Sequence, residues 1–221
     1  MDQKTSSNRT SCIRCGECCL KSSPTLHEED IPLIMEGFIE KHNLYTIRAG
    51  ELVLDNIQGR MKITVRELIK VRETPKGGCV FYDPEALACT IYAHRPIQCA
   101  ALVCWDDSEF MRVYDRPRAD RKKIIRDNTL LRLLEEHEKR CAYAELERYV
   151  KSIEKDGEEA VRKIIRLLKI DYSLRTLVSE KMGIKITEMD FLFGRPLIDT
   201  IAMFGLKVTR EIDGSFFVTS I

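Results

Sequence analysis

The chain has 221 residues, of which 36 are Lys or Arg and 35 are Asp or Glu, so its formal net charge is +1. This balance gives no global basic field for non-specific binding to nucleic acid, which is therefore not an expected partner. No run approaches the ~18 consecutive apolar residues of a membrane span, and the polar residues 1–11 lack the apolar segment of a secretory signal. We expect a cytoplasmic protein with no membrane span.

Short strands are expected in the first half of the chain. Alternating apolar and β-branched residues between 51 and 74 predict two or three short strands, interrupted at Gly59. Residues 79–83 and 89–92 form two further strand-like runs, which predicts a small hairpin that carries Cys79 and Cys89. The segment 96–104 starts with proline, a residue favoured at the first position of a helix, and is expected to begin as a helical turn.

The second half of the chain has a helical pattern. From residue 117 onward apolar residues recur at the helix period, and segment 141–155 repeats this pattern. The Asp-Gly pair at 213–214 predicts a terminal β-hairpin. We therefore predict an α+β protein. Residues 1–116 form a small cysteine-rich metal-binding domain with short strands, and residues 117–221 form a helical extension that ends in the hairpin.

The nine cysteines are the most informative residues of the chain. Cytoplasmic thiols stay mostly reduced, so these cysteines need a reason other than disulfides, and metal binding is the leading one. Eight of them precede residue 105, and four of those stand in one run of the form C-x2-C-x2-C-C. The eight candidate ligands are Cys12, Cys15, Cys18, Cys19, Cys79, Cys89, Cys99 and Cys104. The ninth, Cys141, lies in a predicted helix and is expected to be an incidental thiol.

Two kinds of metal centre fit this spacing. Three evenly spaced cysteines on one loop are the arrangement of bacterial ferredoxins and favour a 4Fe-4S cluster, whose fourth ligand would come from one of the four later cysteines. A single tetrahedral zinc usually takes two separated C-x2–4-C pairs. Eight thiols nevertheless divide into two tetrathiolate sites, so Zn²⁺ is the alternative cofactor.

Neighbouring residues bear on how such a loop would bind metal. Cys18 and Cys19 are adjacent, and adjacent side chains generally point in different directions. We expect one of them to complete the loop site, while the other joins the later cysteines or remains a free redox-active thiol. Gly16 permits the positive φ that such a loop often demands. Arg95 is a candidate cofactor-binding residue, because its guanidinium would face cluster sulfurs or an anionic ligand. A structural turn with a salt bridge is the alternative role for Arg95.

The cysteine pattern resembles a known family. The run Cys12-x2-Cys15-Gly-Glu-Cys18-Cys19, followed by Cys79-Val-Phe-Tyr-Asp and by Cys89-Thr-Ile-Tyr-Ala-His-Arg-Pro-Ile-Gln-Cys99, looks like the cysteine-cluster family called the zinc- or iron-chelating domain. The resemblance covers about the first 105 residues and implies metal chelation through these cysteines. One class of relatives comprises flagellin lysine N-methylases thought to use an iron–sulfur cluster. Ala100 departs from an arginine that commonly follows the last of these cysteines.

Three functions follow from these observations. The preferred one is a metal-binding protein that carries an iron–sulfur cluster with a redox or cluster-assisted modification role. The second is a zinc-stapled structural or interaction module, and the third, implied by the resemblance, is a protein-lysine N-methylase. The chain lacks the common nucleotide, NAD and hydrolase motifs, so no catalytic residue is assigned. A protein or a small molecule is the expected partner.

Overall fold

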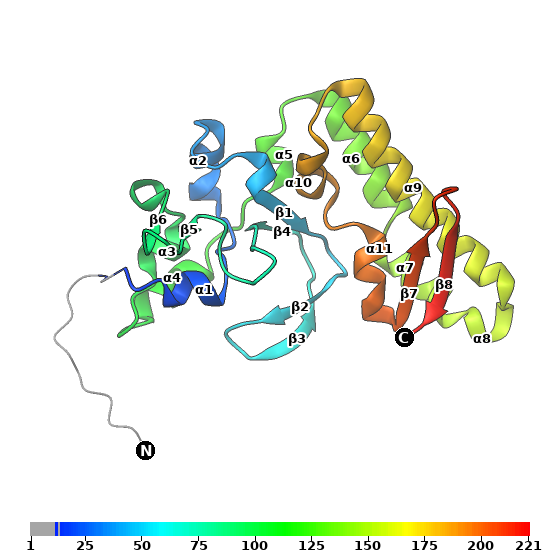
Figure 1. Ribbon diagram of the computed structural model, residues 1–221, viewed down its shortest axis with the longest axis horizontal. Helices are drawn as coiled ribbons and strands as arrows, with labels where there is room; N and C mark the ends of the chain where they lie inside the picture. The colour runs from blue at the N-terminus through cyan, green and yellow to red at the C-terminus, as the bar shows by residue number, and fades with distance from the viewer. Residues whose placement is uncertain (1–11, 13) are drawn as a thin grey trace, which may run out of the picture. The chain divides into compact units, whose positions relative to one another are not determined.

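The computed structural model describes residue 12 and residues 14–221, which form two compact units (Figure 1). Unit 1 contains the described residues up to Leu44 together with Leu68–Ile124, and unit 2 contains Tyr45–Glu67 and Ile125–Ile221. The units follow spatial contacts, and the division of the chain at residue 117 stays a prediction. None of the helices in the described ranges is long and apolar enough to cross a membrane.

Unit 1 is built from short elements. Its α-helices are α1 (Glu17–Lys21), α2 (Ile31–Met35), α3 (Ile97–Ala101), α4 (Ser108–Tyr114) and α5 (Arg121–Ile124). Its strands are β4 (Leu68–Val71), β5 (Tyr82–Asp83) and β6 (Ala88–Cys89), and β1 (Leu44–Ile47) begins at the last residue before the chain enters unit 2. Short 3-10 turns lie at Glu28–Asp30, Lys41–Asn43 and Tyr92–His94.

The segment that follows α1 anchors the cysteine run to the rest of unit 1. Leu26 N–H donates to the carbonyl of Ile69 at 2.8 Å, and Val71 N–H donates to the carbonyl of Pro24 at 3.0 Å. On the other side of this segment, Ala119 N–H donates to the carbonyl of Leu26 at 3.1 Å. Leu26 and Ile69 are fully buried. The backbone after α1 is therefore held between β4 and the segment that precedes α5.

The helix α3 is fixed at its start by buried polar side chains. Asp30 accepts a hydrogen bond from Ile97 N–H at 2.8 Å with one carboxylate oxygen and from His27 N–H at 2.9 Å with the other. The side-chain nitrogen of Gln98 lies 3.1 Å from His27 Nε2. As predicted, a helical turn begins close to Pro96, which is the residue just before the first helical position.

The structure confirms the predicted strands between 51 and 74, which are β2 (Leu52–Asp55), β3 (Arg60–Ile63) and β4. β2 and β3 pair antiparallel, with Leu52 opposite Ile63. The hairpin of β5 and β6 also forms, but it is shorter than predicted, and Cys79 precedes it instead of lying in a strand. Asp83 Oδ1 accepts from the N–H groups of Glu85 and Ala86 at 2.8 and 3.1 Å, and this side-chain turn shortens the strand pair.

Unit 2 is mainly helical and ends in a hairpin. Its α-helices are α6 (Asn128–Arg140), α7 (Tyr143–Lys151), α8 (Ile153–Asp156), α9 (Glu158–Met182), α10 (Met189–Phe193) and α11 (Leu197–Thr200), and its last two strands are β7 (Leu206–Arg210) and β8 (Phe216–Ser220). The core contains Leu146, Ile164 and Leu168 from the helices and Phe216 from the hairpin, which lies beside α9 (Figure 1). The predicted amphipathic helices and terminal hairpin are confirmed, and the fold class is α+β.

Candidate metal centre

The first cysteine run forms a loop that leads into α1. Arg14 and Gly16 both adopt the left-handed backbone conformation, with φ of 57° and 80°. Arg14 N–H donates a hydrogen bond to Cys12 Sγ over 3.4 Å. Backbone N–H groups that donate to sulfur are common around metal-bound cysteines. The loop therefore has a backbone shape and a donor that suit a metal-bound sulfur.

Close packing joins this loop to the segment around β5. A Cβ atom on Gly16 would lie 2.1 Å from the hydroxyl oxygen of Tyr82, so only glycine fits there. Cys79 N–H donates to the carbonyl of Cys19 at 2.7 Å, and the backbone of Gly78 lies against Cys19 and the residue after it. Cysteines about 60 positions apart in the sequence are thus brought into direct backbone contact.

Cys19, Cys79, Cys89 and Cys99 form one group of interacting thiols, which we call the inner group. Burial and the charges of Cys18, Cys79 and Cys89 together raise the pKa of Cys19 to about 12. Burial also raises the pKa of Cys99 well above its ordinary value, and the charges of the other inner thiols and of Cys18 add to the rise. The free thiols of Cys19 and Cys99 therefore hold their protons, which a bound metal ion would displace.

Cys104 belongs instead with the loop. Loss of solvation raises its pKa, and the next largest causes are the charges of Cys15, Cys18 and Cys12. Cys15, Cys18 and Cys104 are all exposed, whereas Cys79 of the inner group is buried. We call Cys12, Cys15, Cys18 and Cys104 the outer group. The eight cysteines predicted as ligands therefore lie in two neighbouring sets within unit 1.

The spacing of the sulfurs bears on the kind of metal. Cys18 Sγ and Cys19 Sγ are 4.0 Å apart. Among the residues that the structure describes, no three cysteine sulfurs lie within 4.8 Å of one another. Sulfurs bound to one tetrahedral zinc ion at about 2.3 Å would stand about 3.8 Å apart. Binding of a single zinc ion would thus require each set of thiols to draw together.

Two arginines flank one aromatic ring beside the loop. The guanidinium carbon of Arg14 lies 4.1 Å from the centroid of the Tyr92 ring, and that of Arg95 lies 3.9 Å from the same centroid. A cation at this distance from an aromatic ring is attracted to its face. The shared ring brings Arg95 close to Arg14 of the cysteine loop.

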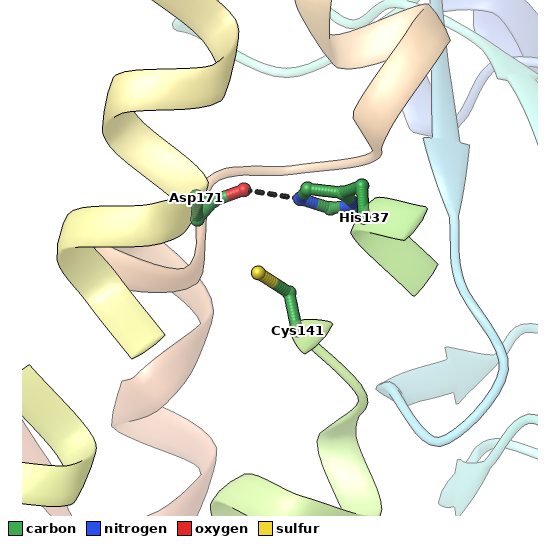
Figure 2. Close-up of side chains that lie close together, drawn as sticks. All are labelled: His137, Cys141 and Asp171. Carbon is green, nitrogen blue, oxygen red and sulfur yellow. Dashed lines mark hydrogen bonds and ion pairs between the residues drawn. The ribbon is translucent and has the colours of Figure 1, made fainter. Parts of the chain in front are cut away.

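Unit 2 contains a further group of metal-ligating residue types, which the sequence analysis did not single out. Atoms of His137, Cys141 and Asp171 lie within 4.8 Å of one another, and all three residues are buried (Figure 2). The residues come from the end of α6 and from the middle of α9. His137 and Asp171 occupy positions in otherwise apolar helical stripes, and this sequence signal could have identified them.

Hydrogen bonds already occupy the ligand atoms of this group. His137 Nε2 lies 2.6 Å from Asp171 Oδ1, and His137 Nδ1 lies 3.5 Å from Arg48 Nη1. Arginine only donates, so Nδ1 accepts and Nε2 carries the hydrogen that Asp171 accepts. Asp171 also accepts from Arg175 Nε at 3.0 Å and from Leu197 N–H at 3.0 Å. These contacts explain the group as a polar network that ties α6, α9 and α11 together.

The thiol of Cys141, the third member of this group, is buried and protonated. Burial and the charge of Asp171 raise the pKa of Cys141 to about 12. Cys141 also packs in the apolar core of unit 2. The other charged groups that act on it are Arg48, Arg175 and Glu138 of the same unit. The neutral, buried Cys141 therefore serves as a reference residue for the experiments below.

The comparison with protein families agrees with the cysteine pattern. Residues 11–115 match the family model CxxCxxCC, described as "Putative zinc- or iron-chelating domain". No curated protein matches the chain, and no solved structure matches it. The matched residues include all eight cysteines of the inner and outer groups, so the match supports metal binding by this part of the chain.

Proposed function

Because residues 11–115 belong to the CxxCxxCC family of zinc- or iron-chelating domains, we propose that this protein binds a 4Fe-4S cluster and uses it in a redox role. The outer group would hold the cluster: Cys12, Cys15 and Cys18 from the loop and Cys104 from the segment after α3. When bound, such a cluster gives or takes one electron at a time. The family match supports metal chelation, and the choice of iron over zinc is our proposal.

The position of Cys104 is the observation that carries this proposal. A C-x2-C-x2-C loop supplies three thiolates, and a cubane cluster needs a fourth from elsewhere in the chain. Cys104 interacts with all three loop thiols. With Cys104 as the fourth ligand, the ferredoxin-like loop would have a complete set of four sulfurs.

The surroundings of the outer group also fit a cluster. Four thiolates accumulate negative charge, which the Arg14 N–H donor at Cys12 and the guanidinium groups of Arg14 and Arg95 partly offset. The outer thiols are mostly exposed, so an electron partner can approach them. The exposed position is what a redox role requires, because electron exchange needs close access to the cluster.

The test is anaerobic purification followed by analysis of iron, acid-labile sulfide and zinc. We expect brown protein with broad absorbance near ~400 nm that dithionite bleaches. Cys15→Ser should remove the outer cluster, whereas Cys141→Ser should leave the metal content unchanged. Colourless protein with stoichiometric zinc would overturn the iron–sulfur proposal and support the zinc-stapled module. Turnover of S-adenosylmethionine by the reduced protein would instead favour the methylase reading.

The single tryptophan offers a second readout of the outer group. Trp105 directly follows Cys104 and lies in a turn closed by the bridge between Val103 and Asp106. Iron–sulfur clusters absorb in the range in which tryptophan emits, and Zn²⁺ does not. We therefore expect cluster loading to quench Trp105 fluorescence strongly and zinc loading to leave most of it. Quenching that persists in the Cys104→Ser variant would contradict Cys104 as a ligand.

Arg95 is proposed to tune this cluster. Its charge lies beside the loop, and a nearby positive charge favours the reduced, more negative state of a cluster. Arg95→Gln should therefore make the reduction potential more negative in an anaerobic redox titration. The control is Arg112→Gln, because Arg112 lies in α4 of the same unit and pairs with Glu109. Equal shifts in the two variants would remove this role from Arg95.

A further inference from the structure

We propose that the inner group, Cys19, Cys79, Cys89 and Cys99, is a second four-thiolate metal centre, separate from the outer group and adjoining it at the Cys18–Cys19 peptide bond. The inference goes beyond the proposed function, which needs only the outer group. A thiophilic metal is the class of ligand, either a zinc ion or a second iron–sulfur cluster. The experiment below distinguishes these two.

Backbone contacts bring the inner cysteines together from three separate segments. Cys79 N–H donates to the carbonyl of Cys19 at 2.7 Å, and Tyr82 N–H donates to the carbonyl of Cys79 at 3.1 Å. Tyr82 pairs in turn with Cys89 across the β5–β6 hairpin. The first three inner cysteines are therefore linked through main-chain hydrogen bonds.

The fourth inner cysteine is delivered by α3. Asp30 accepts from Ile97 N–H at the first turn of α3, and Gln98 accepts from Thr25 N–H at 2.9 Å. Cys99 is the next residue along the helix, and its strongest interactions with other thiols are with Cys79 and Cys19. The buried contacts at the start of α3 thus fix the position of Cys99.

Cys18 and Cys19 have different surroundings, although their sulfurs are only 4.0 Å apart. Both lie in α1, and successive side chains on an α-helix diverge by about 100°. Cys18 is exposed like Cys15 and Cys104, whereas Cys19 is half-buried like Cys89 and Cys99. Without Cys18 the outer group would have only three thiols, and without Cys19 the inner group would have only three. Assigning Cys18 to the outer group and Cys19 to the inner group completes both.

The inner centre is expected to be structural. Its thiols are less exposed than three of the four outer ones, and they connect α1, the β5–β6 hairpin and α3. These elements are five residues long or shorter, too short to be stable by themselves. A closed tetrathiolate centre stabilises such segments because the metal binds the folded arrangement only.

Metal analysis of matched variants tests whether the eight cysteines form two separate metal centres. Full-length Cys99→Ser and Cys19→Ser should each lose the inner metal and keep the outer, while Cys104→Ser and Cys18→Ser should do the reverse. Cys141→Ser should keep both. The metal that remains in Cys104→Ser, zinc or iron with sulfide, identifies the inner centre. Full metal content in Cys99→Ser, or loss of the same metal from inner and outer variants, would overturn the inference.

A second measurement covers the case in which an inner variant fails to fold. The loaded wild-type chain is titrated with a chelator, and alkylated cysteines are identified by mass spectrometry. We expect the outer thiols to become reactive together, and the four inner thiols to follow together at higher chelator concentration. Simultaneous reaction of all eight would overturn the division. Two steps with zinc in the outer group would overturn only the proposed iron–sulfur function, and a wild-type chain without metal would overturn both proposals.

Discussion

At the scale of single residues, Gly16 shows how one position joins the loop to the rest of unit 1. Its backbone is left-handed, and the ring of Tyr82 occupies the space that a Cβ atom would need. Gly37 has a similar φ of 82° but nothing within 4 Å of its Cβ position. The two glycines therefore separate the effect of backbone conformation from the effect of close packing.

This contrast gives a prediction. Gly16→Ala should lose most of the bound metal, because Tyr82 or the loop must move. Gly37→Ala should cost only about 1–2 kcal/mol of stability for the left-handed backbone and keep its metal. Metal content and chemical denaturation measure the two effects. Normal metal content in Gly16→Ala would show that the loop does not depend on this packing.

In unit 2, the single residue to test is Asp171, which joins several elements. It is buried and accepts hydrogen bonds from His137, Arg175 and Leu197. Asp171→Asn should lower the free energy of unfolding by about 3–5 kcal/mol, because it breaks the buried ion pair with Arg175 and leaves Arg175 only its longer ion pair with Asp190. Glu159→Gln is the matched control on the same helix. Glu159 makes exposed ion pairs, so its loss should cost about 1 kcal/mol or less.

At the scale of elements, short helices depend on the side chains that hold their ends. The five residues of α3 gain little stability from their own hydrogen bonds, so Asp30 and Gln98 decide where this helix begins. Cys99, a proposed metal ligand, is therefore positioned by residues that are not proposed ligands. Sequence patterns around cysteines do not reveal such supports.

Asp30→Ala tests this dependence. The substitution leaves the N–H groups of Ile97 and His27 without their acceptor, at about 1–3 kcal/mol each. We expect faster alkylation of Cys99 and loss of inner metal. Asp120→Ala is the control, because Asp120 accepts from Lys122 N–H at the start of α5, a helix without cysteine. Similar metal loss in both variants would point to general destabilisation of unit 1.

At the scale of the whole molecule, the two units carry different spectroscopic signals. Trp105, the only tryptophan, lies in unit 1, while the long helices α6, α7 and α9 lie in unit 2. A chelator should therefore change tryptophan fluorescence while most of the helical circular dichroism persists, because the metal stabilises unit 1. Complete loss of the helical signal on chelation would contradict this assignment.

The stability of unit 2 should depend on pH through its buried network. Burial lowers the pKa of His137 below its ordinary 6.5, and the nearby Arg48 and Arg175 lower it further. The hydrogen bond from His137 is the main cause that lowers the pKa of Asp171 to about 2 despite its burial. Both groups bind protons more readily in the unfolded chain. Their contributions to stability are thus present at neutral pH and decrease as the pH falls.

Thermal unfolding followed by helical circular dichroism checks this sign. The melting temperature should fall from about pH 7 to pH 5 as unfolded histidine gains a proton, and fall again below about pH 4 as unfolded Asp171 does. His137→Gln should remove most of the first decrease, and it should also reduce the second, because the hydrogen bond that lowers the pKa of Asp171 is lost. A melting temperature that rises as the pH falls would contradict the neutral state of His137.

Local features of this protein followed from its sequence alone. The cysteine spacing indicated the loop of candidate ligands, the helix period predicted α9, and the Asp-Gly pair predicted the terminal hairpin. Each of these signals depends on residues that are close along the chain. Helices and strands repeat their side-chain direction every few residues, so a periodic pattern of residue types predicts them directly.

Only the tertiary structure decided which distant residues meet. It placed Cys104 beside the loop and Cys79 against Cys19, and it brought Arg14 and Arg95 to one ring. It also buried Asp171 beside His137. These pairings arise because short elements pack where their apolar faces and backbone donors can be satisfied together, and that fit involves the whole unit. Cysteine spacing gives only the distance along the chain, whereas a metal ion can bind only those candidate ligands that lie close together in space.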